Sequence, residues 1–199
     1  REGVVTLSLV GVPLDVDRGD PRALGQWYTP DRLARRVAEW AGVRGLRVLE
    51  PSAGTGRLAV ACRDAGAFVD CVEVTADNCG VLEALGFAVE RGDFCSLAPR
   101  DEYDLAVGNP PFENGGEGRH IEHALRWAPR VVAVLRMQSL AGIDRHSRVW
   151  GRAWLARLAI CVGRPAFAES GGTFEVIVAD VRREGSGPTA IEWWEGAWK

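Results

Sequence analysis

The feature of this sequence that most restricts its fold is an alternation of short apolar segments with segments of helical periodicity between residues 30 and 135. Parallel strands must be joined by crossover connections, and helices usually form them. The pattern therefore predicts an α/β fold with a mostly parallel sheet and helices on both of its faces. Thr29 and Pro30 are typical of a helix N-cap and a first helical residue. The predicted strands are 46–50, 68–74, 87–90, 105–107 and 131–135, and the predicted helices cover 30–40, the residues up to 65, 76–85 and 121–127.

The last part of the chain follows a different pattern. Residues 160–162 and 174–181 have the composition of strands, and the connection 163–173 leaves no room for a crossover helix. These strands therefore predict an antiparallel hairpin at one edge of the sheet. The tail 182–199 is expected to pack back on a single domain that comprises 1–199.

Composition narrows the class of protein further. With 199 residues, 47% of them hydrophobic, the chain can bury the core of one domain. No apolar run reaches the ~18 residues of a membrane helix, and the run 4–12 lacks the flanks of a signal peptide. Five scattered cysteines form no C-x-x-C pair, which disfavours a zinc site or a disulfide framework. We therefore expect a cytoplasmic protein with reduced thiols, no metal and no membrane partner.

Residues 48–58 carry the strongest local signal. A predicted strand ends in Glu50, a turn with Gly54 and Gly56 follows, and a helix then begins. Glycines let the backbone approach a ligand closely, and a helix N-terminus offers unpaired N–H groups. Dinucleotide-binding turns normally have a third glycine where this chain has Ala59, and Glu50 would repel a pyrophosphate. The turn therefore favours a ligand that carries a positive charge.

Two further strand ends carry residues suited to a nucleoside. Glu73 closes the second predicted strand about 20 residues after the turn, where related folds bind a ribose diol. Asp93 and Phe94 follow the third strand. An acid can accept a hydrogen bond from an exocyclic amine, and a ring can stack on a purine. In the alternative interpretation, the two acids are solvated and Phe94 belongs to the core.

The fourth strand ends in the tetrapeptide Asn109-Pro110-Pro111-Phe112. Two prolines hold the backbone extended, and the carbonyl of Pro110 and the amide of Asn109 can converge on one point. Phe112 would supply a flat apolar wall beside them. This arrangement predicts a site that accepts hydrogen bonds from an NH2 group whose π-system rests on the ring.

Three segments resemble the motifs of S-adenosylmethionine-dependent amino-methyltransferases: 28–30 (Tyr-Thr-Pro), 50–56 (Glu-Pro-Ser-Ala-Gly-Thr-Gly) and 109–112 (Asn-Pro-Pro-Phe). The particular likeness is to DNA N6-adenine methyltransferases of the γ arrangement, in which the cofactor motif precedes the catalytic one. The resemblance covers 26–135 well and the remainder loosely. It implies a class I, Rossmann-like methyltransferase fold, S-adenosylmethionine as cofactor and DNA as partner.

The resemblance also implies roles for individual residues. Glu50 would face the cofactor ammonium, Glu73 would bind the ribose hydroxyls, and Asp93 and Phe94 would bind the adenine. The target adenine would leave the duplex and enter a pocket formed by Asn109, Pro110, Pro111 and Phe112. The cofactor residues implied in this way are Tyr28, Thr29, Pro30, Glu50, Ala53, Gly54, Thr55, Gly56, Glu73, Asp93 and Phe94.

Charge is distributed unevenly along the chain. Residues 119–164 contain nine arginines and two acids, so this stretch is +7 while the whole chain is −3. A helix over 145–158 would place three arginines on one face, with Trp150, Trp154 and Leu158 roughly opposite. Phosphate contact is the natural use of such a face, and a solvated helix face is the alternative. The predicted DNA-binding residues are Arg119, Arg145, Arg148, Arg152 and Arg164.

Two other functions stay open on the sequence. The same chemistry serves enzymes that methylate amino groups in RNA or a protein glutamine, although the glutamine enzymes usually have Tyr where this chain has Phe112. A catalytically silent S-adenosylmethionine-binding subunit is the other possibility. Because only 182–199 follow the last predicted strand, no target-recognition domain is evident there, and a separate specificity subunit or a homo-oligomer is a possible partner.

Overall fold

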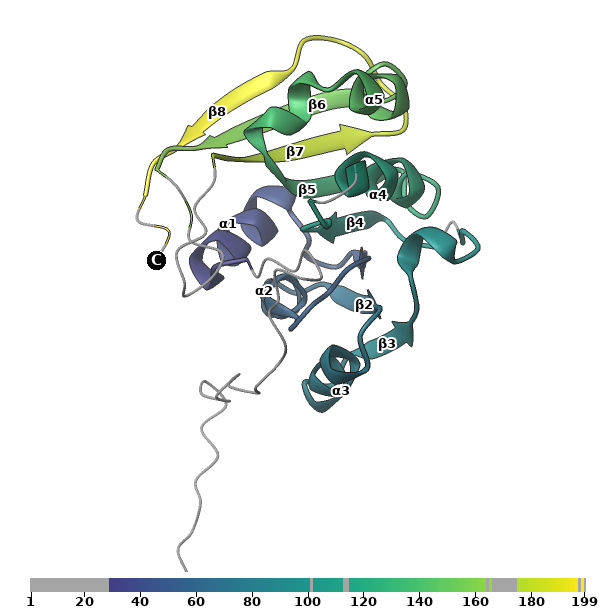
Figure 1. Cartoon of the computed structure of the whole chain (residues 1–199). Helices are drawn as coiled ribbons and strands as arrows, with labels where there is room; N and C mark the ends of the chain where they lie inside the picture. The colour runs from purple at the N-terminus through teal and green to yellow at the C-terminus, as the bar shows by residue number, and fades with distance from the viewer. Residues whose placement is uncertain are drawn as a thin grey trace, which may run out of the picture.

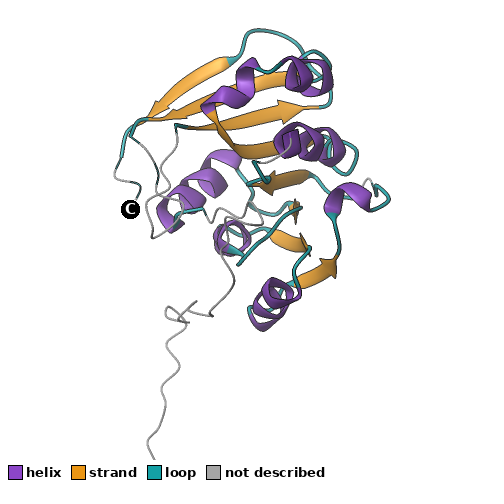
Figure 2. Cartoon of the chain, viewed as in Figure 1, coloured by secondary structure: helices purple, strands orange, loops and turns teal. Residues whose placement is uncertain are grey.

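The computed structural model describes residues 29–100, 102–112, 115–163, 165, 175–196 and 198. In this part of the chain, eight strands form one sheet, and helices pack around it (Figures 1 and 2). The strands are β1 (Arg47–Glu50), β2 (Phe68–Glu73), β3 (Ala88–Arg91), β4 (Leu105–Gly108), β5 (Arg130–Arg136), β6 (Trp154–Cys161), β7 (Val176–Arg182) and β8 (Ala190–Trp194). The α-helices are α1 (Asp31–Ala41), α2 (Arg57–Asp64), α3 (Ala76–Ala84), α4 (Gly116–Ala124) and α5 (Ile143–Arg145).

The strand order across the sheet is β3-β2-β1-β4-β5-β7-β6-β8. Strands β3, β2, β1, β4 and β5 are parallel neighbours, whereas β7 is antiparallel to both β5 and β6. The predicted α/β sheet and its antiparallel hairpin are therefore confirmed. The hairpin is not outermost, because β8 pairs with β6 in parallel and occupies the edge.

Alternating side chains of the central strands pack into two apolar layers, one on each face of the sheet. On β5, Val132 and Val134 join the cluster that contains the buried residues of α1 and α2. Ala133 and Leu135 join the opposite cluster, together with Ile121 of α4. The sheet is thus covered on both faces, which accounts for the nearly continuous apolar runs of its middle strands.

Two helix starts differ from the sequence prediction. Helix α1 begins at Asp31, and Pro30, not Thr29, is its N-cap, without a side-chain capping bond. Helix α4 begins at Gly116, five residues before the predicted start at 121. Because glycines are poor helix formers, the sequence pattern did not predict this first turn of α4. A Cβ on Gly116 would lie 2.5 Å from the Pro111 carbonyl oxygen, so close packing requires glycine there.

The predicted helix over 145–158 is wrong. Helix α5 passes into one π-helical turn, His146–Trp150, and strand β6 begins at Trp154. Residues spaced by four also lie on one face of a strand, so the spacing of Trp154 and Leu158 fits either structure. Pairing with β7 decides between them, because it satisfies the backbone of the buried positions Leu158 and Ala159.

An ion network ties α1 to the second half of the sheet. The Asp180 carboxylate, fully buried on β7, accepts bonds from Arg130 Nε at 3.0 Å and Arg157 Nε at 2.9 Å. The same two arginines donate to the carbonyls of Ala41 and Trp40 at the end of α1. None of the helices in the described residues has the length and hydrophobicity needed to cross a membrane.

Candidate functional site

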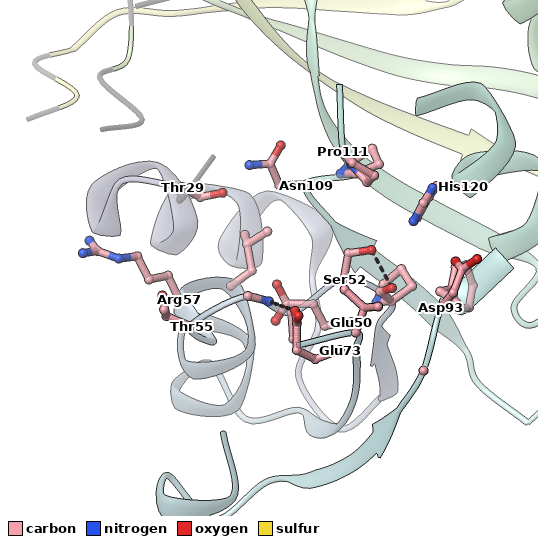
Figure 3. A pocket seen from close by; sticks show the side chains of 18 residues that line it. Thr29, Glu50, Ser52, Thr55, Arg57, Glu73, Asp93, Asn109, Pro111 and His120 are labelled. Carbon is pink, nitrogen blue, oxygen red and sulfur yellow. Dashed lines mark hydrogen bonds between the residues drawn. The ribbon is translucent and has the colours of Figure 1, made fainter. Parts of the chain in front are cut away.

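A cavity of about 200 Å³ lies at the carboxyl ends of the parallel strands (Figure 3). The turn after β1, the ends of β2 and β3, the loop after β4 and the start of α4 all contribute to its wall. The predicted site residues that line it are Thr29, Glu50, Ala53, Gly54, Thr55, Glu73, Asp93, Phe94, Asn109, Pro110 and Pro111. Pro30, Gly56 and Phe112 do not line it, and Tyr28 lies outside the described residues.

The turn between β1 and α2 is fixed against its neighbours by short contacts. The Gly54 N–H donates to Glu73 Oε2 at 2.7 Å, and the Ala53 N–H donates to the Val72 carbonyl at 3.0 Å. Gly56 has φ +83°, and a Cβ there would lie 2.7 Å from a Leu82 methyl carbon. Gly56 therefore acts by letting the turn approach α3 rather than by lining the cavity.

Glu50 is a buried acid with one unused oxygen. Its side chain is 3% exposed, and the carboxylate accepts a bond from the Ala59 N–H. Its Oε2 has no hydrogen-bond partner among the described residues. Burial raises the pKa of Glu50 well above its ordinary value, and the nearby Glu73 raises it further. A cationic donor placed in the cavity would satisfy this oxygen and restore the ionised form.

Glu73 is equally buried, but protein groups already occupy its carboxylate. Oε2 accepts from Gly54, and Oε1 accepts from the N–H and the hydroxyl of Thr75 at 2.8 and 2.9 Å. Because each carboxylate oxygen can accept two bonds, Oε2 can still accept one from a ligand. Val74, the next residue, is 57% exposed and provides an apolar wall of the cavity that the sequence analysis did not single out.

Asp93 and Phe94 form the far wall of the cavity. Asp93 caps the short 3-10 helix Phe94–Ser96, accepting from the Cys95 N–H at 3.1 Å and the Ser96 hydroxyl at 2.9 Å. Phe94 is 2% exposed and its ring packs edge-on against His123, with centroids 4.8 Å apart. Both residues therefore have structural contacts in addition to any ligand contact.

The segment after β4 enters the cavity where β4 passes close to the β1 turn. A Cβ on Gly108 would lie 3.3 Å from Pro51 Cδ, so the two segments are in near contact. Asn109 and Pro111 come next in the chain, and Figure 3 shows both above Ser52 and Thr55 of the turn. The predicted amine-accepting segment and the predicted cofactor turn therefore share one cavity.

Phe112 lies outside this cavity. Its ring is 6% exposed, and the Arg136 guanidinium lies 4.9 Å from the ring centroid. Arg136 also donates to the Phe112 carbonyl at 2.7 Å, and the buried Glu117 accepts from Arg136 at 3.4 Å. A role for this ring as a wall of the target site stays a prediction and requires the ring to turn toward the cavity.

The predicted arginine face does not exist as a helical stripe. Arg145 donates to the Ser139 carbonyl at 3.0 Å and lies 3.9 Å from Glu117. Arg148 pairs with Asp144 at 2.9 Å and with Glu122 at 3.2 Å.

Two other predicted DNA-binding arginines lie at the surface. The Arg152 side chain is 70% exposed, 4.0 Å from Glu122, and Arg119 is exposed on α4. Arg164 lies outside the described residues.

The sequence analysis missed His120, which lines the cavity from the first turns of α4. Its Nδ1 lies 3.0 Å from the Gly116 carbonyl oxygen and 3.5 Å from Cys95 Sγ. No motif marks it, and its position depends on the early start of α4. Among the described residues, no three His, Cys, Asp or Glu side chains gather in a way that could hold a metal ion.

The sequence matches no family model. A release factor glutamine methyltransferase from Bordetella pertussis is 30% identical over an alignment of 160 positions, which covers 69% of this chain and 58% of that protein. The chain therefore spans less than two thirds of the length of this relative.

Two solved structures have a similar fold. PH1948 from Pyrococcus horikoshii, provisionally assigned as an RNA methyltransferase, superposes with a TM-score of 0.72 at 22% identity over 83% of this chain and 91% of that one. A modification subunit of a provisionally assigned type I restriction enzyme from Vibrio vulnificus YJ016 gives 0.68 at 16% identity, over 89% and 48%.

The sheet order and these superpositions agree. The fold is that of the class I S-adenosylmethionine-dependent methyltransferases. In this methyltransferase fold the strand order reverses between β1 and β4, and open α/β sheets bind ligands at such a point. Pro51 after β1 and Asn109 after β4 lie on either side of it, so the cavity has the position expected of the site.

Proposed function

We propose that this chain transfers the methyl group of S-adenosylmethionine to the N6 amino group of adenine in DNA. The observation that carries the proposal is that two chemically different segments meet in one cavity. Glu50 offers a buried carboxylate oxygen to a cation, and Asn109-Pro110 offers oxygens to an amine. A methyltransferase for amines needs both halves side by side, because cofactor and target must be held in line for transfer.

The cavity residues fit the cofactor. Two buried oxygens in its wall, Glu50 Oε2 and Thr55 Oγ1, have no partner among the described residues, and buried polar groups normally have one. An ammonium group supplies such donors. Thr29, Glu50 and 53–55 would hold the methionine end, Glu73 the ribose, and Asp93 and Phe94 the adenine. When bound, S-adenosylmethionine supplies an electrophilic methyl group.

The segment after β4 would activate the target amine. The N6 lone pair of adenine is conjugated into the ring and is a poor nucleophile. Asn109 Oδ1 and the Pro110 carbonyl would each accept one N–H, favouring a pyramidal nitrogen and stabilising the positive charge that develops on it. The product ammonium is acidic enough to lose its proton to water, so no strong base is required. Phe112 would stack on the flipped base after its ring leaves Arg136.

Several observations support DNA as the substrate. The motif order, with 50–56 before 109–112, resembles that of the γ arrangement, and Tyr-Thr-Pro at 28–30 resembles the same pattern. One structural neighbour is the modification subunit of a type I restriction enzyme, which supports DNA and a separate specificity subunit as partners.

The sequence relative supports a second candidate, the side-chain amide of a protein glutamine. The amide nitrogen is also conjugated, so the same two acceptors at Asn109 and Pro110 suit it. The first structural neighbour supports RNA as a further candidate substrate.

A transfer assay with methyl-labelled S-adenosylmethionine tests the proposal. Unmethylated DNA, total RNA and a glutamine-bearing release factor are offered separately, and the modified products are identified by mass spectrometry. We expect N6-methyladenine in DNA, and none with Asn109→Ala. Label found only in RNA or protein would overturn the assignment to DNA. Cofactor binding without transfer to any of the three would instead indicate a silent subunit.

A further inference from the structure

His120 is the one imidazole in the wall of the cavity within the described residues, and the proposed chemistry does not use it. It projects from α4 beside the segment that follows β4. Figure 3 shows its ring between Pro111 and Asp93, on the side of the cavity away from Arg57. This is the side at which Asp93 and Phe94 would meet the purine of the cofactor.

The hydrogen bonding of His120 fixes which nitrogen carries the proton. Nδ1 lies 3.0 Å from the carbonyl oxygen of Gly116, four residues earlier on α4. A carbonyl oxygen can only accept, so Nδ1 must be the donor. In the neutral ring, Nε2 then carries a lone pair and is a hydrogen-bond acceptor. Because the Nδ1 contact orients the imidazole, the Nε2 lone pair is available to a ligand.

The surroundings keep this ring neutral at pH 7. Asp93 and Cys95 face it from the 3-10 helix, and Arg119 and His123 lie near it on its own helix. Burial lowers the pKa of His120 below its ordinary value, and Arg119 and His123 act in the same direction. The Gly116 bond and Asp93 oppose them without reversing the shift.

We propose that His120 determines purine specificity: its Nε2 accepts a hydrogen bond from the exocyclic amine of the cofactor adenine, next to the Asp93 carboxylate. The inference rests on the proposed binding of S-adenosylmethionine. Two acceptors on one side of the purine select an amine and reject a carbonyl at the same carbon. His120 would thus disfavour a hypoxanthine-bearing ligand, which places an oxygen lone pair against both groups.

Calorimetric titration with S-adenosylhomocysteine and with its deaminated analogue, S-inosylhomocysteine, tests this inference on the full chain. The variants are His120→Phe, which keeps a ring against Phe94 but removes the acceptor, and His120→Gln, whose amide oxygen can replace Nε2. The matched control is His123→Phe. His123 lies three residues further on α4 and also packs on Phe94, but it does not line the cavity. Thermal unfolding verifies that each variant is folded.

We expect His120→Phe to bind S-adenosylhomocysteine about 2- to 10-fold more weakly, the range that one neutral hydrogen bond gives. The preference for the adenine over the hypoxanthine ligand should fall by a similar factor. His120→Gln should restore both, and His123→Phe should change neither.

Two results would overturn the inference, and they differ from failure of the proposed function. If His120→Phe binds both ligands as the wild type does, His120 does not touch the purine. If His123→Phe loses the same preference, the effect arises from packing around Phe94. If the wild-type protein binds neither ligand, the cofactor site itself is wrong, and that outcome refutes the proposed function as well.

Discussion

Replacing Glu50 with glutamine should have opposite effects on the ligand-free and the ligand-bound protein. The substitution keeps the shape of the side chain and the acceptor for the Ala59 N–H but removes the charge. Without ligand, the wild type holds a buried acid whose Oε2 has no partner among the described residues. We therefore expect Glu50→Gln to be as stable as the wild type at low pH and more stable at high pH.

The direction of this pH dependence of stability follows from the raised pKa of Glu50. Between the ordinary value of 4.5 and the higher folded value, the folded protein binds more protons than the unfolded chain. Stability of the wild type therefore falls as pH rises through this window, by up to about 1.4 kcal/mol per pH unit. The stability of the variant does not have this pH dependence. The excess of its free energy of unfolding over that of the wild type should therefore grow from pH 4.5 upward and become constant above the folded pKa of Glu50.

Ligand binding shifts this comparison in the opposite direction. A charge-assisted hydrogen bond contributes about 1.5–3 kcal/mol, so losing it should weaken S-adenosylhomocysteine binding by about 10- to 100-fold. At a concentration of 100 times the wild-type Kd, the ligand stabilises the wild type by about 2.7 kcal/mol and the variant by only about 0.4–1.4 kcal/mol. Denaturant unfolding with and without ligand, at pH 5 and pH 8, measures both effects.

Glu73→Gln is the matched control, because Glu73 is as buried as Glu50 but accepts three bonds from protein donors. Its NH2 group would face an N–H donor, so Glu73→Gln should lose about 1–3 kcal/mol without ligand. The reasoning fails if Glu50→Gln is the less stable protein at pH 8. It also fails if that variant keeps wild-type affinity for the ligand.

Three further predictions concern other parts of the molecule. Asn109→Ala should nearly abolish methyl transfer yet keep S-adenosylhomocysteine affinity within a few fold, and equal losses in calorimetry and transfer assays would contradict its place at the target. Asp180→Asn should cost about 3 kcal/mol in denaturant unfolding, because it leaves Arg130 and Arg157 without a buried counter-charge. Burial alone would raise the pKa of Asp180, but these arginines hold it below 3.8, so the deficit should persist above pH 3.8 and shrink as pH falls through the folded pKa. Arg152→Ala should flatten the salt dependence of DNA binding by about 0.9 units, alike for all sequences, and an unchanged slope would remove Arg152 from the interface.

The fold was predictable because the apolar and helical segments of the sequence coincide with the strands and helices that pack in the structure. Each of the five parallel strands ends within two residues of the predicted end, and three of them carry a chemically distinctive residue there. Since parallel strands share one carboxyl edge, Glu50, Glu73 and Asn109 had to meet once the sheet formed. The cavity wall was therefore predictable from strand ends alone, without any knowledge of side-chain contacts.

His120 and Phe112 show where that reasoning stops. Phe112 lies in the connection between β4 and α4, and His120 lies in the first half of α4, where glycines at 115, 116 and 118 obscure the helical period. The sequence does not determine that Arg136, on the neighbouring strand, covers the Phe112 ring. Nor does it show that a helix starting at Gly116 turns His120 into the cavity. Strand ends can be located by pattern, whereas the direction of a side chain on a loop depends on its three-dimensional neighbours.

The arginine-rich stretch illustrates the same difference for charge. A sequence excess of +7 over 119–164 takes no account of acids that the fold brings near from elsewhere. Asp180 and Glu117, from outside this stretch, engage four of the nine arginines, and Glu122 and Asp144 within it engage two more. Among the described arginines of this stretch, Arg119, Arg126, Arg148 and Arg152 are exposed. A DNA backbone would therefore meet a few separate charges around α4, not a continuous stripe, and such sparse contacts favour weak binding with a shallow salt dependence, which a specificity subunit could strengthen.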